Sequence, residues 1–227
     1  MYSRFCATCH QFPDDGPSLN GKLLENTLKE WQASRHAEEG RQCQSCHMPG
    51  RRHLWRGIHD PAMVREALTT DFTLEPLASG RLHIQAVIRN TGAGHYFPTY
   101  LVPRVWLRLV LIDPAGRERS LLAEQVVARD VDVWLKEERS DTRLAPDEAR
   151  RLEVEIGPPP EAGWEVELRV DVAPREHYER MFATVLRNNA ADLDAEALRL
   201  LEQALAEARD ARFTALRERR PLPVIAN

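Results

Sequence analysis

The sequence has no cysteine after residue 46, no long apolar run and no excess of basic residues. It contains no stretch of 18 or more apolar residues, so it predicts no transmembrane segment. Its 31 basic and 35 acidic residues give a net charge of −4, which offers no electrostatic basis for binding nucleic acid. Because all four cysteines lie within the first 46 residues, we expect a cysteine-dependent module there and a cysteine-free remainder.

The cysteines form two copies of one pattern, CATCH at residues 6–10 and CQSCH at residues 43–47. Cys-x-x-Cys-His is the attachment signature of c-type haem. Two thiols at this spacing can each form a thioether with one vinyl group of the porphyrin, and the adjacent histidine supplies the proximal iron ligand. We therefore expect two covalently bound haem c groups. The residues that hold them are Cys6, Cys9 and His10 for the first haem, and Cys43, Cys46 and His47 for the second.

Other uses of paired cysteines fit less well. Zinc ribbons usually separate their two Cys-x-x-Cys halves by about 15–20 residues, whereas 33 residues lie between Cys9 and Cys43. Zinc also gives no reason for a histidine after both pairs. A thioredoxin motif belongs in a βαβ context, which the flanking sequence lacks, and structural disulfides are the third alternative.

Four further histidines are candidates for the sixth iron ligand. His36 ends an expected helix over residues 23–36 and lies off its apolar stripe; its alternative is an exposed residue at a helix end. His59 precedes Asp60-Pro61, a predicted N-cap and first helical position of a helix through Leu68. His53 is a less constrained candidate. His95 lies in a loop, residues 90–99, whose two glycines permit close approach of another group, although it could equally bond its own backbone.

The remaining polar candidates have simpler explanations. Arg51, Arg52 and Arg56 could pair with haem propionates or form a solvated basic patch. His83 and His177 fit surface positions. There are four candidate distal ligands but only two irons that need one. The spare histidines are therefore structural, or they ligate a haem in a neighbouring subunit.

Beyond residue 70 the sequence predicts an antiparallel β-sandwich, broadly immunoglobulin-like, because short alternating or apolar segments are separated by turn residues. The expected strands are residues 72–77, 81–89, 104–112, 121–128, 131–135, 150–156 and 164–172. Helices are expected over residues 176–187 and 194–219. The fold class is therefore α+β, with a small, mostly helical haem module (1–70), a β-sandwich (71–175) and a C-terminal helical segment (176–227).

With these motifs placed, the chain resembles the C-terminal portion of multihaem c-type cytochromes from respiratory electron transfer. The matching segments are residues 31–36, 43–49, 53–60 and 90–99. The resemblance implies that His36, His59 and His95 are distal haem ligands, without saying which haem each serves. The chain departs from the usual pattern in having only two haem motifs and in having Tyr100 where glycine is more common.

Thioether formation follows export, so we expect a periplasmic or extracellular protein. No signal peptide precedes the first motif, which suggests a mature or trimmed form, or the tail of a longer product. So little chain precedes Cys6 that the edge of the first haem should be exposed or covered by another subunit.

The function that fits best is single-electron transfer through low-spin, bis-histidine haems. The partners would be other redox proteins or cytochromes, and a homo-oligomer or an extended haem chain is a further hypothesis. The alternative is a haem enzyme that acts on a small nitrogen or sulfur compound at an open iron.

Overall fold

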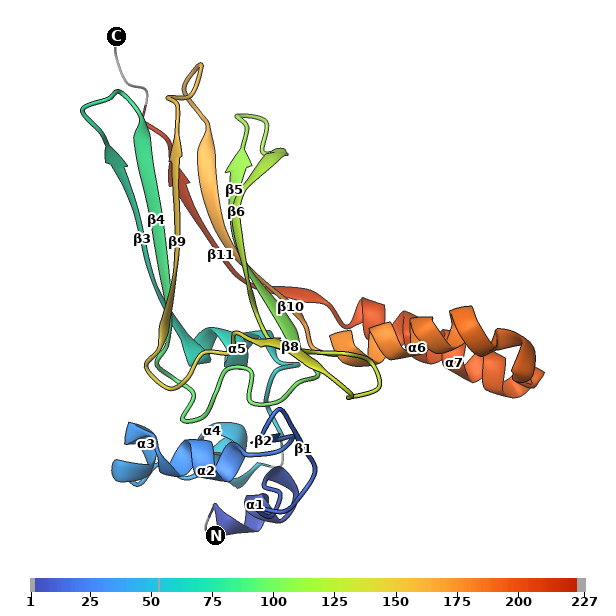
Figure 1. The fold of residues 1–227 in the computed structure, drawn as a ribbon. Helices are drawn as coiled ribbons and strands as arrows, with labels where there is room; N and C mark the ends of the chain where they lie inside the picture. The colour runs from blue at the N-terminus through green and yellow to red at the C-terminus, as the bar shows by residue number, and fades with distance from the viewer. Residues whose placement is uncertain (1–2, 53, 224–227) are drawn as a thin grey trace.

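The computed structural model describes residues 3–52 and 54–223. It contains a helical N-terminal module, two antiparallel sheets and a helical hairpin that extends sideways from the base of the sheets (Figure 1). The predicted α+β class and the order of its parts are confirmed. In the part of the chain described, no helix is both long and apolar enough to cross a membrane.

The N-terminal module consists of short elements. Its elements are α1 (Arg4–His10), β1 (Ser18–Leu19), β2 (Lys22–Leu23), α2 (Thr27–Gln32), α3 (Arg35–Glu38), α4 (Cys43–His47) and the 3-10 helix η1 (Pro49–Arg51). The single helix expected over residues 23–36 is wrong, because Ser34 adopts extended backbone angles between α2 and α3. The Ser34 hydroxyl donates to Trp31 O at 2.7 Å, which satisfies a carbonyl at the end of α2.

Helix α5 (Pro61–Ala67) leads from the module into the sheets and begins as predicted. The Asp60 carboxylate caps it by accepting hydrogen bonds from Ala62 N at 2.9 Å and Met63 N at 3.1 Å. The chain passes directly from α5 into β3 (Leu68–Pro76).

The two main sheets enclose a shared core, as a sandwich requires. One sheet has the order β3-β4-β9, with β4 at Leu82–Asn90 and β9 at Ala149–Ile156. The other has the order β11-β10-β5-β6, with β5 at Arg104–Ile112, β6 at Glu118–Val127, β10 at Glu165–Ala173 and β11 at Phe213–Pro221. Apolar side chains alternate along the strands: Leu82, Ile84, Ala86 and Ile88 of β4 are fully buried. This period of two explains why the sequence predicted these strands.

The strand expected at residues 131–135 is wrong. Val131 instead ends β7 (Arg129–Val131), which pairs with β8 (Glu138–Asp141). The Asp132 carboxylate accepts hydrogen bonds from the backbone N–H of Trp134 at 3.0 Å and of Glu137 at 2.8 Å. Because a carboxylate that binds following N–H groups stabilises a turn, residues 132–137 connect the two strands.

The C-terminal part is a helical hairpin followed by a strand. The hairpin consists of α6 (Glu176–Asn189), the 3-10 helix η2 (Ala190–Asp192) and α7 (Ala195–Asp210). The expected helix through Arg219 is wrong beyond Asp210, since β11 pairs antiparallel with β10. Its arginines meet acidic residues there; Arg219 Nε lies 2.8 Å from Glu167 Oε2. A sequence with good helix propensity becomes a strand because the sheet edge supplies these partners.

The N-terminal module contacts the base of the sandwich through a second apolar cluster. Leu101, Val102 and Val131 are buried there, and Leu19 and Leu24 of the module pack against them. The division into three domains stays a prediction.

Candidate haem-binding site

The two Cys-x-x-Cys-His motifs lie on α1 and α4, which are joined by hydrogen bonds. Ser3 donates to Gln42 Oε1 through its backbone N at 3.0 Å and its hydroxyl at 2.8 Å. The Ser3 hydroxyl also accepts from Cys43 N at 3.2 Å. Burial raises the pKa of the Cys6 thiol, and the neighbouring Cys43 thiol raises it further. One thiol of each motif is therefore close to one of the other.

All four cysteines are free thiols. Among the described residues, no three histidine, cysteine or acidic side chains are grouped so as to hold a bare metal ion. A zinc site built from both cysteine pairs would need four such ligands at one point.

His47 and His95 lie next to each other with nearly parallel rings. Their ring centroids are 6.1 Å apart, and the ring planes differ by 17°. Each ring is held through Nδ1: His47 Nδ1 donates to Arg56 O, and His95 Nδ1 donates to Tyr96 O at 2.8 Å. These bonds place the proton on Nδ1, so that Nε2 of each ring keeps its lone pair for a metal.

The separation of the two rings matches the one expected for two imidazoles on opposite sides of one metal ion. Histidine nitrogens bind metals at roughly 2 Å, so two imidazoles on opposite sides of one metal have centroids about 6 Å apart. Direct stacking would not require the Nδ1 hydrogen bonds that both rings make. Burial, together with the nearby His47, His36 and His10, lowers the pKa of His95 to about 4, although the hydrogen bond to Tyr96 O opposes this shift. His95 is therefore neutral at pH 7, as a ligand must be.

Two glycines allow the loop of His95 to lie against the helices. At Gly92, a Cβ atom would lie 1.9 Å from Glu66 O, at the end of α5. At Gly94, it would lie 3.0 Å from the Trp31 ring and 3.1 Å from the Cβ of His36. The close approach that the sequence predicted for this loop is confirmed.

His36 is buried and makes a different contact from His95. Its Nε2 lies 3.1 Å from Thr91 O, and Arg35 Nη2 donates to the same carbonyl at 2.6 Å. The usual ligating nitrogen of His36 is therefore engaged by the 90–99 loop. His10 ends α1 as an exposed residue.

The other candidates are exposed, paired elsewhere or outside the described residues. His59 is exposed overall, although partial burial of its imidazole and then the charge of Arg175 lower its pKa. His53 lies outside the described residues. Arg52 is exposed. Arg56, in contrast, forms ion pairs with Asp60 at 2.7 Å and Glu66 at 3.0 Å.

Several residues that organise the site carry no signal in the sequence. Asn90 and Glu30 are buried beside the His95 loop, yet Glu30 lies in a charged helical segment and resembles a surface residue. His177 is buried rather than exposed, so its predicted surface position is wrong. Its charged neighbours in the sequence concealed this. The start of α6 lies against the loop before β5, where His177 N donates to Val102 O at 3.1 Å.

Comparisons with known proteins concern the whole fold. No family model and no curated protein matches the sequence. Among solved structures, the chain is similar to a penta-haem cytochrome c552 from Thermochromatium tepidum, with a TM-score of 0.64 and 23% sequence identity. The similarity covers 97% of this chain and 56% of that chain. The fold resembles a multihaem cytochrome c. The chain thus spans about half the length of that cytochrome, and the likeness extends over both the module and the sandwich.

A second match is much weaker. The CARDB domain of a Pyrococcus furiosus protein, in complex with di-metal ions, gives a TM-score of 0.25 at 17% identity. It covers 47% of this chain and 66% of that chain.

Proposed function

We propose that this chain is a dihaem c-type cytochrome unit that carries single electrons between redox partners. The observation that carries the proposal is the pair His47 and His95, two nearly parallel imidazoles with centroids 6.1 Å apart, each with Nδ1 bonded to a backbone carbonyl. The cytochrome-like fold and the two Cys-x-x-Cys-His motifs support it.

In this proposal, Cys43 and Cys46 hold one haem, with His47 as proximal and His95 as distal ligand. The haem supplies an iron that changes between two oxidation states. The protein holds both imidazoles in the Nδ1–H form, which keeps each Nε2 free to bind; with both nitrogens bound, this haem would have no open coordination position for a substrate.

Cys6 and Cys9 hold the other haem, with His10 as its proximal ligand. Its distal ligand stays a prediction drawn from His36, His53 and His59. The proximity of the Cys6 and Cys43 thiols supports a short path between the two porphyrins. Electron tunnelling weakens steeply with distance, so neighbouring attachment points favour transfer between the haems. Arg52, exposed beside the second motif, is proposed as a propionate partner.

The proposed setting follows from the same chemistry. Covalent haem attachment implies export to the periplasm or the cell exterior. A two-haem unit spans a short distance, so it would exchange electrons with other cytochromes, with further haems of a longer chain or with other copies of itself.

The test is to produce the protein with c-type haem maturation and to measure covalent haem and visible spectra. We expect two haems per chain by mass after denaturation, low-spin spectra, and loss of one haem in a Cys43→Ser, Cys46→Ser variant. His95→Ala should convert half of the haem to a form that binds carbon monoxide. His83→Ala, on the outer face of β4, is the control and should change nothing.

Two results would overturn the proposal. Absence of covalent haem would exclude a c-type cytochrome. Rapid carbon monoxide binding by the unmodified protein would instead favour the alternative, a haem enzyme with an open iron.

A further inference from the structure

The peptide group that joins His95 to Tyr96 is held at both ends by buried side chains. Its carbonyl oxygen, His95 O, accepts a hydrogen bond from Asn90 Nδ2 at 2.9 Å. Its N–H, that of Tyr96, donates to Glu30 Oε2 at 3.0 Å. Asn90 is 0% exposed and Glu30 is 7% exposed, so water does not compete for either contact.

The next peptide group is anchored as well. Phe97 N donates to Leu144 O at 2.8 Å. The carbonyl of the same peptide group, Tyr96 O, accepts the hydrogen bond from His95 Nδ1. Because both peptide groups after His95 are fixed, the backbone of the loop sets the direction of the imidazole.

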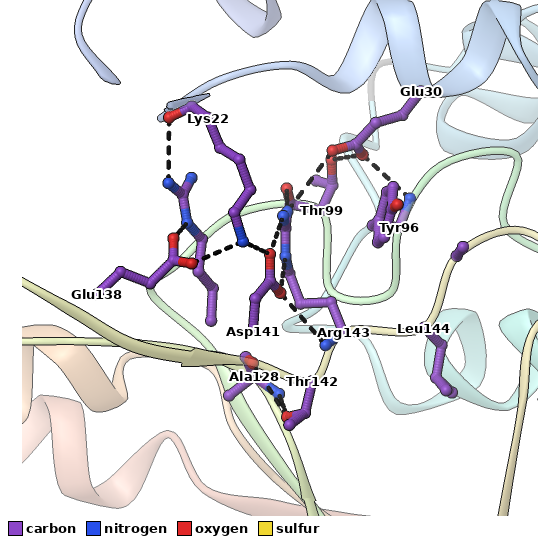
Figure 2. Close-up of polar contacts among 12 residues, drawn as sticks. Lys22, Glu30, Tyr96, Thr99, Ala128, Glu138, Asp141, Thr142, Arg143 and Leu144 are labelled. Atoms are coloured by element: carbon purple, nitrogen blue, oxygen red, sulfur yellow. Dashed lines mark hydrogen bonds and ion pairs between the residues drawn. The ribbon is translucent and has the colours of Figure 1, made fainter. Parts of the chain in front are cut away.

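Glu30 reaches this loop from α2, and its partners hold the loop further along (Figure 2). Thr99 Oγ1 donates to the Glu30 carboxylate at 2.8 Å, and Arg143 Nη1 lies 3.6 Å from it. Arg143 donates to Thr99 O at 2.7 Å, and its guanidinium lies 4.9 Å from the centre of the Tyr96 ring. Both oxygens of Asp141 accept from Arg143, at 2.8 and 2.9 Å.

A gain in folding stability does not explain why these charged side chains are buried together. Buried ion pairs commonly contribute no more to stability than apolar packing of the same volume, since the charges lose their hydration. They do hold atoms in a defined geometry. Here the atoms held are those of residues 96–99, which directly follow His95.

We propose that Glu30 and Asn90 are positioning residues for His95: together they hold the His95–Tyr96 peptide group so that the imidazole stays opposite His47. The inference rests on the proposed function, in which His95 is the distal ligand of the haem on Cys43 and Cys46. Glu30 belongs to the haem module, whereas Asn90 ends β4 of the sandwich. Ligation of the iron is therefore coupled to docking of the module on the sandwich.

The experiment compares Glu30→Ala and Glu30→Gln in the haem-loaded protein with the same two substitutions at Glu25. Glu25 is the control for loss of a carboxylate without loss of a loop contact: it lies on the same module, its pKa is raised by burial and by the nearby Glu30 charge, and none of the described side-chain hydrogen bonds involves it. The readouts are the high-spin fraction, the rate of carbon monoxide binding and the reduction potential, with thermal unfolding as a check of folding.

Glu30→Ala should raise the rate of carbon monoxide binding at one haem by about tenfold, the factor expected from losing a hydrogen bond to a charged group. Glu30→Gln should keep the low-spin spectrum, because its amide oxygen can still accept from Tyr96 N. Its reduction potential should be higher, because a buried negative charge that stabilises oxidised iron is gone. Both Glu25 variants should keep the low-spin spectrum and the rate of carbon monoxide binding of the unmodified protein, because no loop hydrogen bond is lost.

His95→Ala distinguishes failure of the proposed iron ligation from failure of the positioning role of Glu30. If it leaves both haems low-spin, the proposed ligation fails, whatever Glu30 does. If it opens one haem while Glu30→Ala behaves like Glu25→Ala, only the positioning role fails. If Glu30→Ala does not fold, Thr99→Val is the replacement, because it removes one hydrogen bond from the Glu30 carboxylate. Faster carbon monoxide binding by Thr99→Val than by Glu25→Gln would support the positioning role, and an equal rate would overturn it.

Discussion

The guanidinium of Arg129 lies 2.8 Å from the carboxylate of Glu138, and their side chains are only 1% and 3% exposed. Arg129 also donates to three backbone carbonyls of the β1–β2 hairpin, those of Leu19, Lys22 and Leu23, at 2.9, 3.1 and 2.8 Å. One side chain of the sandwich thus binds the β1–β2 hairpin of the N-terminal module. These polar contacts add to the apolar cluster around Leu101, which also joins the N-terminal module to the sandwich.

Arg129→Met should destabilise the protein by about 3 kcal/mol, because it leaves the buried Glu138 carboxylate with Lys22 and Asn20 alone and removes the Arg129 donor from three carbonyls. The measurement is the free energy of unfolding in urea. Arg151→Met is the control: Arg151 is 62% exposed, and its pair with Glu153 should contribute less than about 1 kcal/mol. Equal effects of the two substitutions would contradict the structural role of Arg129.

Asp141 predicts a pH dependence of stability. Burial alone would raise its pKa, but hydrogen bonds from Arg143 and Lys22 outweigh burial and hold the pKa well below the usual 3.8. The unfolded chain therefore takes up this proton first as the pH falls. The stabilisation is complete well above pH 3.8 and is lost as the pH falls through 3.8 towards the lower pKa of the folded state.

The variant Asp141→Asn tests this point. At pH 7 it should lower the free energy of unfolding by about 1.5–3 kcal/mol, the usual contribution of a hydrogen bond to a charged group. The difference from the unmodified protein should shrink below about pH 4. Urea unfolding of both proteins from pH 7 to pH 3 measures it, and a difference that does not change with pH would show that the charge of Asp141 is not responsible.

Gly92→Ala should displace the loop that carries His95. The added Cβ would lie 1.9 Å from Glu66 O, a backbone atom that cannot move by a change of rotamer. The expected cost is about 3 kcal/mol, at the upper end of the range for overpacking, together with a larger fraction of haem open to carbon monoxide. At Gly157 an added Cβ meets nothing within 4 Å, so Gly157→Ala should be tolerated. A low-spin, fully stable Gly92→Ala variant would show that the loop can shift without cost.

Asp60 links the start of α5 to the residue that holds His47. Its carboxylate caps α5 and pairs with Arg56, whose carbonyl accepts from His47 Nδ1. Asp60→Ala should therefore cost about 1–2 kcal/mol, as loss of an N-cap usually does, whereas Asp60→Asn should keep most of the cap. Thermal unfolding of the two variants measures both losses of stability. Equal losses in Asp60→Ala and Asp60→Asn would mean that the charge of Asp60, and not its capping hydrogen bonds, stabilises α5.

The sequence predicted those elements of the fold whose cause lies within a few neighbouring residues. The alternating pattern of β4 and β5 and the Asp60-Pro61 start of α5 identified those elements, because burial of one strand face and helix capping leave a mark within a few residues. The helix expected through Arg219 failed, because β11 is a strand only by virtue of its partner β10. Glu30 went unnoticed because its partner, Tyr96 N, lies 66 residues away in the sequence. Asn90 lies close to His95 in the sequence, but only the fold buries it against the carbonyls of Leu144 and Ala145.

The sequence by itself determined the chemistry that the chain can carry: two thiol pairs, each with an adjacent histidine, and a surplus of histidines for the sixth position. Covalent attachment depends on spacing along the chain, so it can be read there. Only the tertiary structure decided which histidine lies opposite His47. Loop 90–99 crosses from the sandwich onto the module, where its glycines allow contact and buried Asn90 and Glu30 hold the His95–Tyr96 peptide group. Because that arrangement joins residues from three separate segments, no local pattern encodes it.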